Sequence, residues 1–144
     1  MWHWWFGDEN MAKKISDENK ICFISCVIND KQYNECLESW KTLRVPDGMT
    51  VESLVIRDAV SMTEGYQAGM ESSDAKYKIY IHQYVWINSK EFLIIMISEF
   101  QKHPDYGILG VVGSQSLPLN GLWWEGKNWG YSRLYKWKDE RISL

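Results

Sequence analysis

Several features that mark common protein classes are missing from this chain of 144 residues. No apolar run approaches the ~18 residues that suggest a membrane-spanning helix, so we expect no membrane span. The formal net charge is -3 and there is no basic stripe, which argues against nucleic acid as a partner. The three histidines are far apart and show no ligand spacing, so no metal site is expected from them.

Nucleotide-binding and redox motifs are absent as well. There is no G-x-G-x-x-G, no G-x-x-x-x-G-K-[ST] and no G-x-S-x-G, although a Ser-His-Asp triad stays open. The three cysteines, at 22, 26 and 36, include no C-x-x-C pair and fit buried, reduced thiols. The apolar amino terminus ends at Gly7 and lacks a basic start, so it is no secretory signal. We therefore expect a cytoplasmic protein.

Short apolar runs alternate with amphipathic stretches along the chain. The patterns predict strands at 21–28, 51–56, 77–81 and 108–112, and helices at 31–42, 61–72 and 88–103. This order predicts an α/β fold of three layers, a mainly parallel sheet with helices on both faces, followed by a hairpin of 123–125 with 131–135. We expect an aromatic segment and linker over 1–19 and one domain over 20–144.

Polar side chains follow the predicted strands, at the edge where ligands bind in open α/β sheets. Asp58 comes directly after the second strand and could accept hydrogen bonds from a base or a sugar hydroxyl. It could equally help the chain turn into the helix that Ser61 caps, because aspartate favours turns. Asn29 and Asp30, after the first strand, carry the same two interpretations.

Four stretches of the chain occur together in a familiar order: ICFISCVIND (21–30), VESLVIRDAVSMTEGYQAGM (51–70), AKYKIYIHQYVWI (75–87) and GILGVVGSQSLPLNGLWWEG (107–126). They resemble the glycosyltransferase-like proteins related to glycosyltransferase family two, which have the GT-A fold. The resemblance implies a nucleotide-sugar donor site at the carboxyl ends of the first strands. The segment Ser25 to Asp30 and Asp58 would contact the nucleoside, and Glu64 to Gly69 would line the site.

The resemblance also implies a metal-binding carboxylate after the third strand, in a pattern like His-Gln-Asp-Val. A divalent cation there would neutralise the departing diphosphate. This chain reads His82-Gln83-Tyr84-Val85, and the neutral phenol of a tyrosine cannot replace a carboxylate ligand. Gln67 stands where asparagine is expected. The chain ends at Leu144, so we expect the acceptor half, with the catalytic base, to be missing.

We therefore predict a nucleotide-sugar-binding domain that is catalytically inactive and needs no cofactor. A divalent cation would be expected only with a carboxylate in place of Tyr84, and an active transferase would need another chain to supply the acceptor half. The predicted donor-binding residues are Ser25, Asn29, Asp30, Arg57, Asp58, Ser61, Gln67, His82 and Gln83.

Apolar residues also occur where this fold would expect polar ones, which suggests an altered or engineered surface. Ile94 and Ile95 fall within the polar arc of their helix, and the chain has nine tryptophans. The predicted interaction surface comprises Trp2, Trp4, Trp5, Trp86, Ile94, Ile95 and Trp129. The amino-terminal aromatics could cover Ile94, Ile95 and Trp86, a partner or second copy could bind the surface, or a sugar could stack on it. The alternative function is thus that of a protein–protein interaction module, which would bind a partner protein or a second copy of the chain as a homodimer.

Overall fold

The computed structural model describes residues 16–111, 113–114, 118–122, 125, 128–129, 133–135 and 141–143. The chain divides into two compact units, Met1–Ser98 and Glu99–Leu144. The first unit contains the parallel sheet, and the second contains short antiparallel strand pairs. The prediction of one domain over residues 20–144 stays a prediction.

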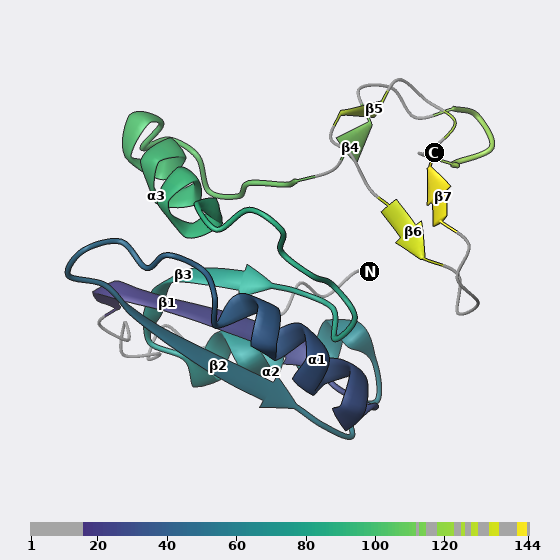
Figure 1. Cartoon of the computed structure of the whole chain (residues 1–144), viewed down its shortest axis with the longest axis horizontal. Coiled ribbons are helices and arrows are strands. Elements are labelled where there is room, and N and C mark those ends of the chain that lie inside the picture. The colour runs from purple at the N-terminus through teal and green to yellow at the C-terminus, as the bar shows by residue number, and fades with distance from the viewer. Residues whose placement is uncertain are drawn as a thin grey trace, which may run out of the picture. The chain divides into compact units, whose positions relative to one another are not determined.

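Three parallel strands form the sheet of the first unit, in the order β2-β1-β3 (Figure 1). They are β1 (Asp17–Cys26), β2 (Thr50–Ile56) and β3 (Ala75–Tyr80). The register pairs Cys26 with Ile56 on one side of β1 and Ile24 with Tyr80 on the other. Because all three strands are parallel, their carboxyl ends meet at one edge of the sheet.

Two helices cover opposite faces of this sheet (Figure 1). In α1 (Asp30–Trp40), the side chain of the N-cap residue Asn29 accepts the backbone N–H of Gln32 at 3.1 Å. In α2 (Met62–Ser72), the Ser61 hydroxyl accepts the backbone N–H of Glu64 at 3.1 Å. Such caps satisfy N–H groups that have no partner within the helix. The arrangement confirms the predicted α/β layers, with Ser61 as the cap that the sequence indicates.

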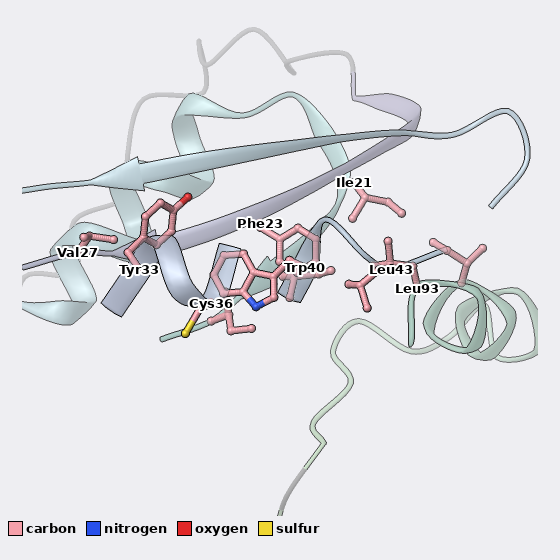
Figure 2. Packing of buried hydrophobic residues seen from close by; sticks show 11 residues of the cluster. Ile21, Phe23, Val27, Tyr33, Cys36, Trp40, Leu43 and Leu93 are labelled. Atoms are coloured by element: carbon pink, nitrogen blue, oxygen red, sulfur yellow. The ribbon is translucent and has the colours of Figure 1, made fainter. Parts of the chain in front are cut away.

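The face of α1 holds the larger part of the core (Figure 2). Trp40 stacks on Phe23 of β1, with ring centroids 5.2 Å apart and 9° between the planes. Its indole N–H donates to the backbone oxygen of Val85 at 3.0 Å, so the buried nitrogen is satisfied. Leu93 and Ile97 of α3 (Phe92–Lys102) join the same cluster. The loop after β3 is therefore fixed against α1.

On the face of the sheet that α2 covers, the helix packs by close approach of its backbone to β1 and not through large side chains. Gly65 and Gly69, one turn apart, are the buried residues of α2. A Cβ at Gly65 would lie 2.5 Å from Cys26 Sγ, and one at Gly69 would overlap Cγ2 of Ile24. These glycines therefore allow the α2 backbone to lie directly on β1.

Two predictions about the second half of the chain are wrong in part. Residues 108–111 form no strand, and Ile108 is 89% exposed, because no strand lies beside them in the described residues. The helix predicted from 88 begins at Phe92, after a turn in which the Phe92 N–H donates to Ser89.

The antiparallel strands lie in the second unit. They are β4 (Gly113–Ser114), which pairs with β5 (Asn128–Trp129), and β6 (Arg133–Tyr135), which pairs with β7 (Arg141–Ser143). Trp123 and Trp124 lie outside the described residues. The hairpin predicted between 123–125 and 131–135 therefore stays a prediction, although Arg133–Tyr135 pairs with β7. Among the described residues, no helix has both the length and the apolar character needed to cross a membrane.

Candidate functional site

The candidate site is the edge of the sheet where β1, β2 and β3 end. Asn29 and Asp30 follow β1, Arg57 and Asp58 follow β2, and residues 82–84 follow β3. Neighbouring strands lie ~4.8 Å apart, so the loops after β2 and β3, on either side of β1, are separated by ~10 Å. The edge thus presents three short polar loops side by side.

Gln83 joins the loop after β3 to the loop after β1. Its side-chain oxygen accepts the backbone N–H groups of Ile28 at 2.8 Å and of Asn29 at 3.0 Å. Its side-chain nitrogen donates to the Gln32 side chain at 3.2 Å. The Gln83 side chain is only 7% exposed, whereas Ile28 and Asn29 are exposed, so these bonds are part-buried. The Gln83 amide therefore links the loop after β3 to the loop after β1, and its oxygen is not free to bind a metal ion.

Arg57 and Asp58 form the polar end of β2. The Arg57 guanidinium lies 2.6 Å from a carboxylate oxygen of Asp30, in an ion pair that is more than half exposed. Such a pair contributes about 0–1 kcal/mol to stability, but it positions the guanidinium across the ends of β2 and β1. Asp58 is exposed and has a φ of 55°, in the left-handed region. An aspartate tolerates this conformation better than a branched residue does.

Four aromatic rings cluster at the end of β3, and one of them comes from α2. Tyr66 of α2 contacts Tyr80 edge-on at 5.5 Å and His82 edge-on at 6.5 Å. The His82 ring in turn lies parallel to the Tyr84 ring, at 5.3 Å between centroids and 6° between planes. Burial raises the pKa of the Tyr66 phenol, with further contributions from Cys26 and Tyr84. Tyr66 therefore stays a neutral hydroxyl at the base of the cluster.

The residues at the end of β3 do not fit a hard divalent cation. Magnesium and manganese favour carboxylate oxygens, and the side chain at the expected carboxylate position is the phenol of Tyr84. The oxygen of Gln83 is occupied by two backbone N–H groups, and Asp30 is paired with Arg57. Within the described part of the chain, no group of three or more His, Cys, Asp or Glu side chains could hold a metal ion.

The structure brings most of the predicted donor-binding residues to this edge, but three of them are buried or bonded within the protein. Ser25 is 1% exposed, and its hydroxyl has no hydrogen-bond partner among the described residues. Ser61 is used as the cap of α2. Gln67 is exposed on α2 and donates to Glu71, away from the glycines that face the sheet. Their contacts with a donor stay predictions.

The predicted interaction surface is described only in part. Trp2, Trp4 and Trp5 lie outside the described residues, as does the side chain of Trp129. Trp86 is 45% exposed and Ile95 is 54% exposed, whereas Ile94 is partly buried. The described part of this surface is therefore limited to these exposed residues of the loop after β3 and of α3.

The sequence pattern missed two features of the edge. The bridging role of Gln83 has no local signal, because its partners lie more than 50 residues earlier in the chain. The aromatic cluster had a partial signal, since Tyr80, His82 and Tyr84 alternate in the sequence and would share one side of an extended chain. Its fourth member, Tyr66, comes from α2 and could be placed only by the packing of that helix.

The sequence also matches a known family. The match is to the model described as "Glycosyltransferase like family" and covers residues 22–144, which include β2, β3, the second half of β1 and the polar edge. No curated protein and no solved structure gives a significant match. The family match confirms the resemblance drawn from the four sequence stretches, and the chain belongs to the glycosyltransferase-like family.

Proposed function

We propose that this chain binds a nucleoside diphosphate sugar at the edge formed by β1, β2 and β3, without a divalent cation and without transferring the sugar. The observation that carries the proposal is the side chain at the end of β3. An exposed phenol, Tyr84, stands where the family resemblance implies a metal-binding carboxylate. The rest of the edge keeps groups suited to a nucleotide.

The binding groups lie on the β2 side of the edge. The exposed carboxylate of Asp58 is an acceptor for the N–H groups of a base or the hydroxyls of a ribose. The Arg57 guanidinium is paired with Asp30 through one nitrogen and keeps further N–H donors for phosphate oxygens. These two residues support a nucleoside at the end of β2 with its diphosphate directed toward β1.

The loss of transfer follows from the charge of the leaving group. Breaking the bond between sugar and diphosphate places negative charge on the phosphate oxygens, and a bound cation stabilises that charge. Tyr84 offers one neutral hydroxyl instead. We therefore expect the edge to hold the donor while the barrier to transfer stays high.

Calorimetric titration of the full chain tests this proposal. UDP, GDP and ADP, each with and without attached glucose, are titrated in EDTA and again with manganese. We expect at least one to bind with a dissociation constant between about 10 µM and 1 mM that manganese changes less than about twofold. In Asp58→Ala, binding should weaken by about tenfold, whereas Lys41→Ala, beyond the last turn of α1, should leave it unchanged.

A second variant tests the proposal that the donor binds without a divalent cation. Tyr84→Asp restores a carboxylate, so manganese should tighten its binding by about fivefold or more, which is a moderate metal contribution. The absence of binding by all six ligands would overturn the proposal. So would release of the sugar from the donor by the unmodified chain, measured by chromatography over hours.

A second candidate function is that of an association module, and the exposure of Trp86 and Ile95 favours it. Large apolar side chains on a surface mark interaction sites when they are contiguous. Light scattering behind a sizing column should then give a dimer that Ile94→Lys together with Ile95→Lys converts to monomer. A constant mass of 17.0 kDa at every concentration would exclude self-association.

A further inference from the structure

The ring of Tyr84 presents one open face at the end of β3. The other face is parallel to His82, with 5.3 Å between centroids and 6° between planes, which is an offset stack. Tyr84 is 53% exposed, although three other rings lie nearby. Because one face of the ring lies against His82, the exposed surface of Tyr84 includes the opposite face.

The rings beneath Tyr84 hold this face in place. His82 is contacted edge-on by Tyr66, and Tyr66 is contacted edge-on by Tyr80, so two elements of the fold support the stack. Next to these residues, Gln83 is buried and bonded to the loop after β1. A platform that is fixed before a ligand arrives loses little conformational entropy on binding.

We propose, resting on the function proposed above, that the open face of Tyr84 stacks on the pyranose ring of the bound donor. A pyranose has a face of C–H groups that suits an aromatic ring and a rim of hydroxyls that suits nearby polar atoms. The hydroxyls of Tyr66 and Tyr80 and the imidazole of His82 belong to the same cluster and can supply such contacts. Affinity at the end of β3 then comes from the sugar itself.

The spacing of the edge indicates which ring of the donor reaches Tyr84. A nucleoside bound by Asp58 lies at the end of β2, and β3 is two strand spacings, ~10 Å, away. The diphosphate occupies the interval, above β1 and near Arg57. The group beyond the diphosphate is the sugar, so the sugar and not the base meets Tyr84.

The test compares a nucleoside diphosphate with its glucose conjugate, by calorimetry in EDTA, for four forms of the full chain. These are the unmodified chain, Tyr84→Ala, Tyr84→Phe and the control Tyr106→Ala, which alters a similarly exposed tyrosine of the second unit. The unmodified chain should bind the conjugate about fivefold to twentyfold more tightly than the diphosphate, as expected for one stacked ring. Tyr84→Phe and Tyr106→Ala should keep this ratio, and Tyr84→Ala should lower it to about one.

The outcomes separate this inference from the proposed function. If the diphosphate binds and Tyr84→Ala leaves the ratio unchanged, the donor site stands and sugar stacking is overturned. If Tyr84→Ala weakens the diphosphate and the conjugate equally, the ring stacks on the base, which also overturns the inference. If neither ligand binds the unmodified chain, both proposals fail. Thermal unfolding of each variant confirms that a change in binding is not a loss of folded protein.

Discussion

The side-chain oxygen of Gln83 lies 3.0 Å from the backbone nitrogen of Asn29 and accepts its N–H. The same oxygen accepts the N–H of Ile28 at 2.8 Å. In many α/β proteins such N–H groups, at the start of a helix after a strand, are free to bind phosphate. Here they are occupied by a side chain of the protein, so a phosphate at this edge must rely on side chains such as Arg57.

Removal of the Gln83 amide should destabilise the fold. In Gln83→Leu the two N–H groups lose their acceptor, and both of these hydrogen bonds are part-buried. Each hydrogen bond contributes about 0.5–1.5 kcal/mol, so the loss of two costs about 1–3 kcal/mol. We expect the free energy of unfolding, measured by urea titration, to fall by about that amount.

Gln67→Leu is the matched control for this variant. Gln67 is exposed on α2, and its side chain bonds only along the helix, to Glu71. An exposed change of this kind should stay within about 0.5 kcal/mol. An equal effect of the two substitutions would contradict the assigned role of Gln83.

A methyl group at Gly69 should also destabilise the fold, although alanine favours helices. The added Cβ would overlap Cγ2 of Ile24, a side chain that is fully buried on β1. Overpacking costs about 1–3 kcal/mol, which outweighs the ~1 kcal/mol that alanine gains over glycine in a helix. We expect Gly69→Ala to lower the free energy of unfolding in urea.

A double-mutant cycle with Ile24→Ala identifies the clash. Ile24→Ala removes Cγ2, so Gly69→Ala should cost less in that background than in the unmodified chain. Gly107→Ala, where nothing lies within 4 Å of the new Cβ, should have little effect. Additive effects of Gly69→Ala and Ile24→Ala would mean that α2 moves away from β1 and that the new methyl group does not contact Ile24.

The sequence predicted the parallel layers well because their signals are local. The apolar run at β1 and the cap at Ser61 each depend on a few neighbouring residues. The segment 108–111 has a similar composition, yet it forms no strand. A strand exists only when another strand lies beside it, and composition alone does not show whether such a partner is present.

The candidate site was predictable at the level of the edge but not of its contacts. Asp58 and Arg57 follow a strand, so their location comes from the sequence pattern. Ser25 lies at the same end of β1, but it is buried, because α1 covers the face that it shares with Phe23. The aromatic stack of His82 and Tyr84 depends on side-chain geometry that no spacing rule supplies.

The left-handed backbone at Asp58 gives another prediction. Its φ is 55°, a value that strains a β-branched residue by about 1–2 kcal/mol. Asp58→Val should therefore lower the free energy of unfolding by that amount, and Asp58→Asn should leave it nearly unchanged because asparagine tolerates this region. Asn at this position also removes the charge, so its nucleotide affinity reports on the carboxylate alone.

Asp47→Val provides the comparison for Asp58. Asp47 is an exposed turn residue, and among non-glycine residues of the described chain only Asp58 has a positive φ. Urea titration of both valine variants should show the larger loss at Asp58. A loss at Asp47 that matches it would assign the effect to valine on an exposed loop and not to the backbone angle.

The buried thiol of Cys36 predicts how stability depends on alkaline pH. Burial, with a smaller contribution from Glu35, raises the pKa of Cys36 from 9.0 to about 11. The folded state therefore keeps this proton at pH values where the unfolded chain loses it. The resulting stabilisation is complete below the lower value and is lost as the pH rises through the higher one.

Comparison with Cys36→Ala isolates this group from the lysines that titrate in the same range. At about pH 7.5 the variant should be less stable, because alanine leaves space beside Trp40 and Phe23 in the core. At about pH 10.5 the difference should be smaller by roughly 1–2 kcal/mol, since the unmodified chain then begins to lose the contribution of the thiol. Urea titrations in reducing buffer measure both differences. A gap that stays constant or widens with pH would show that Cys36 ionises as readily in the folded chain as in the unfolded one.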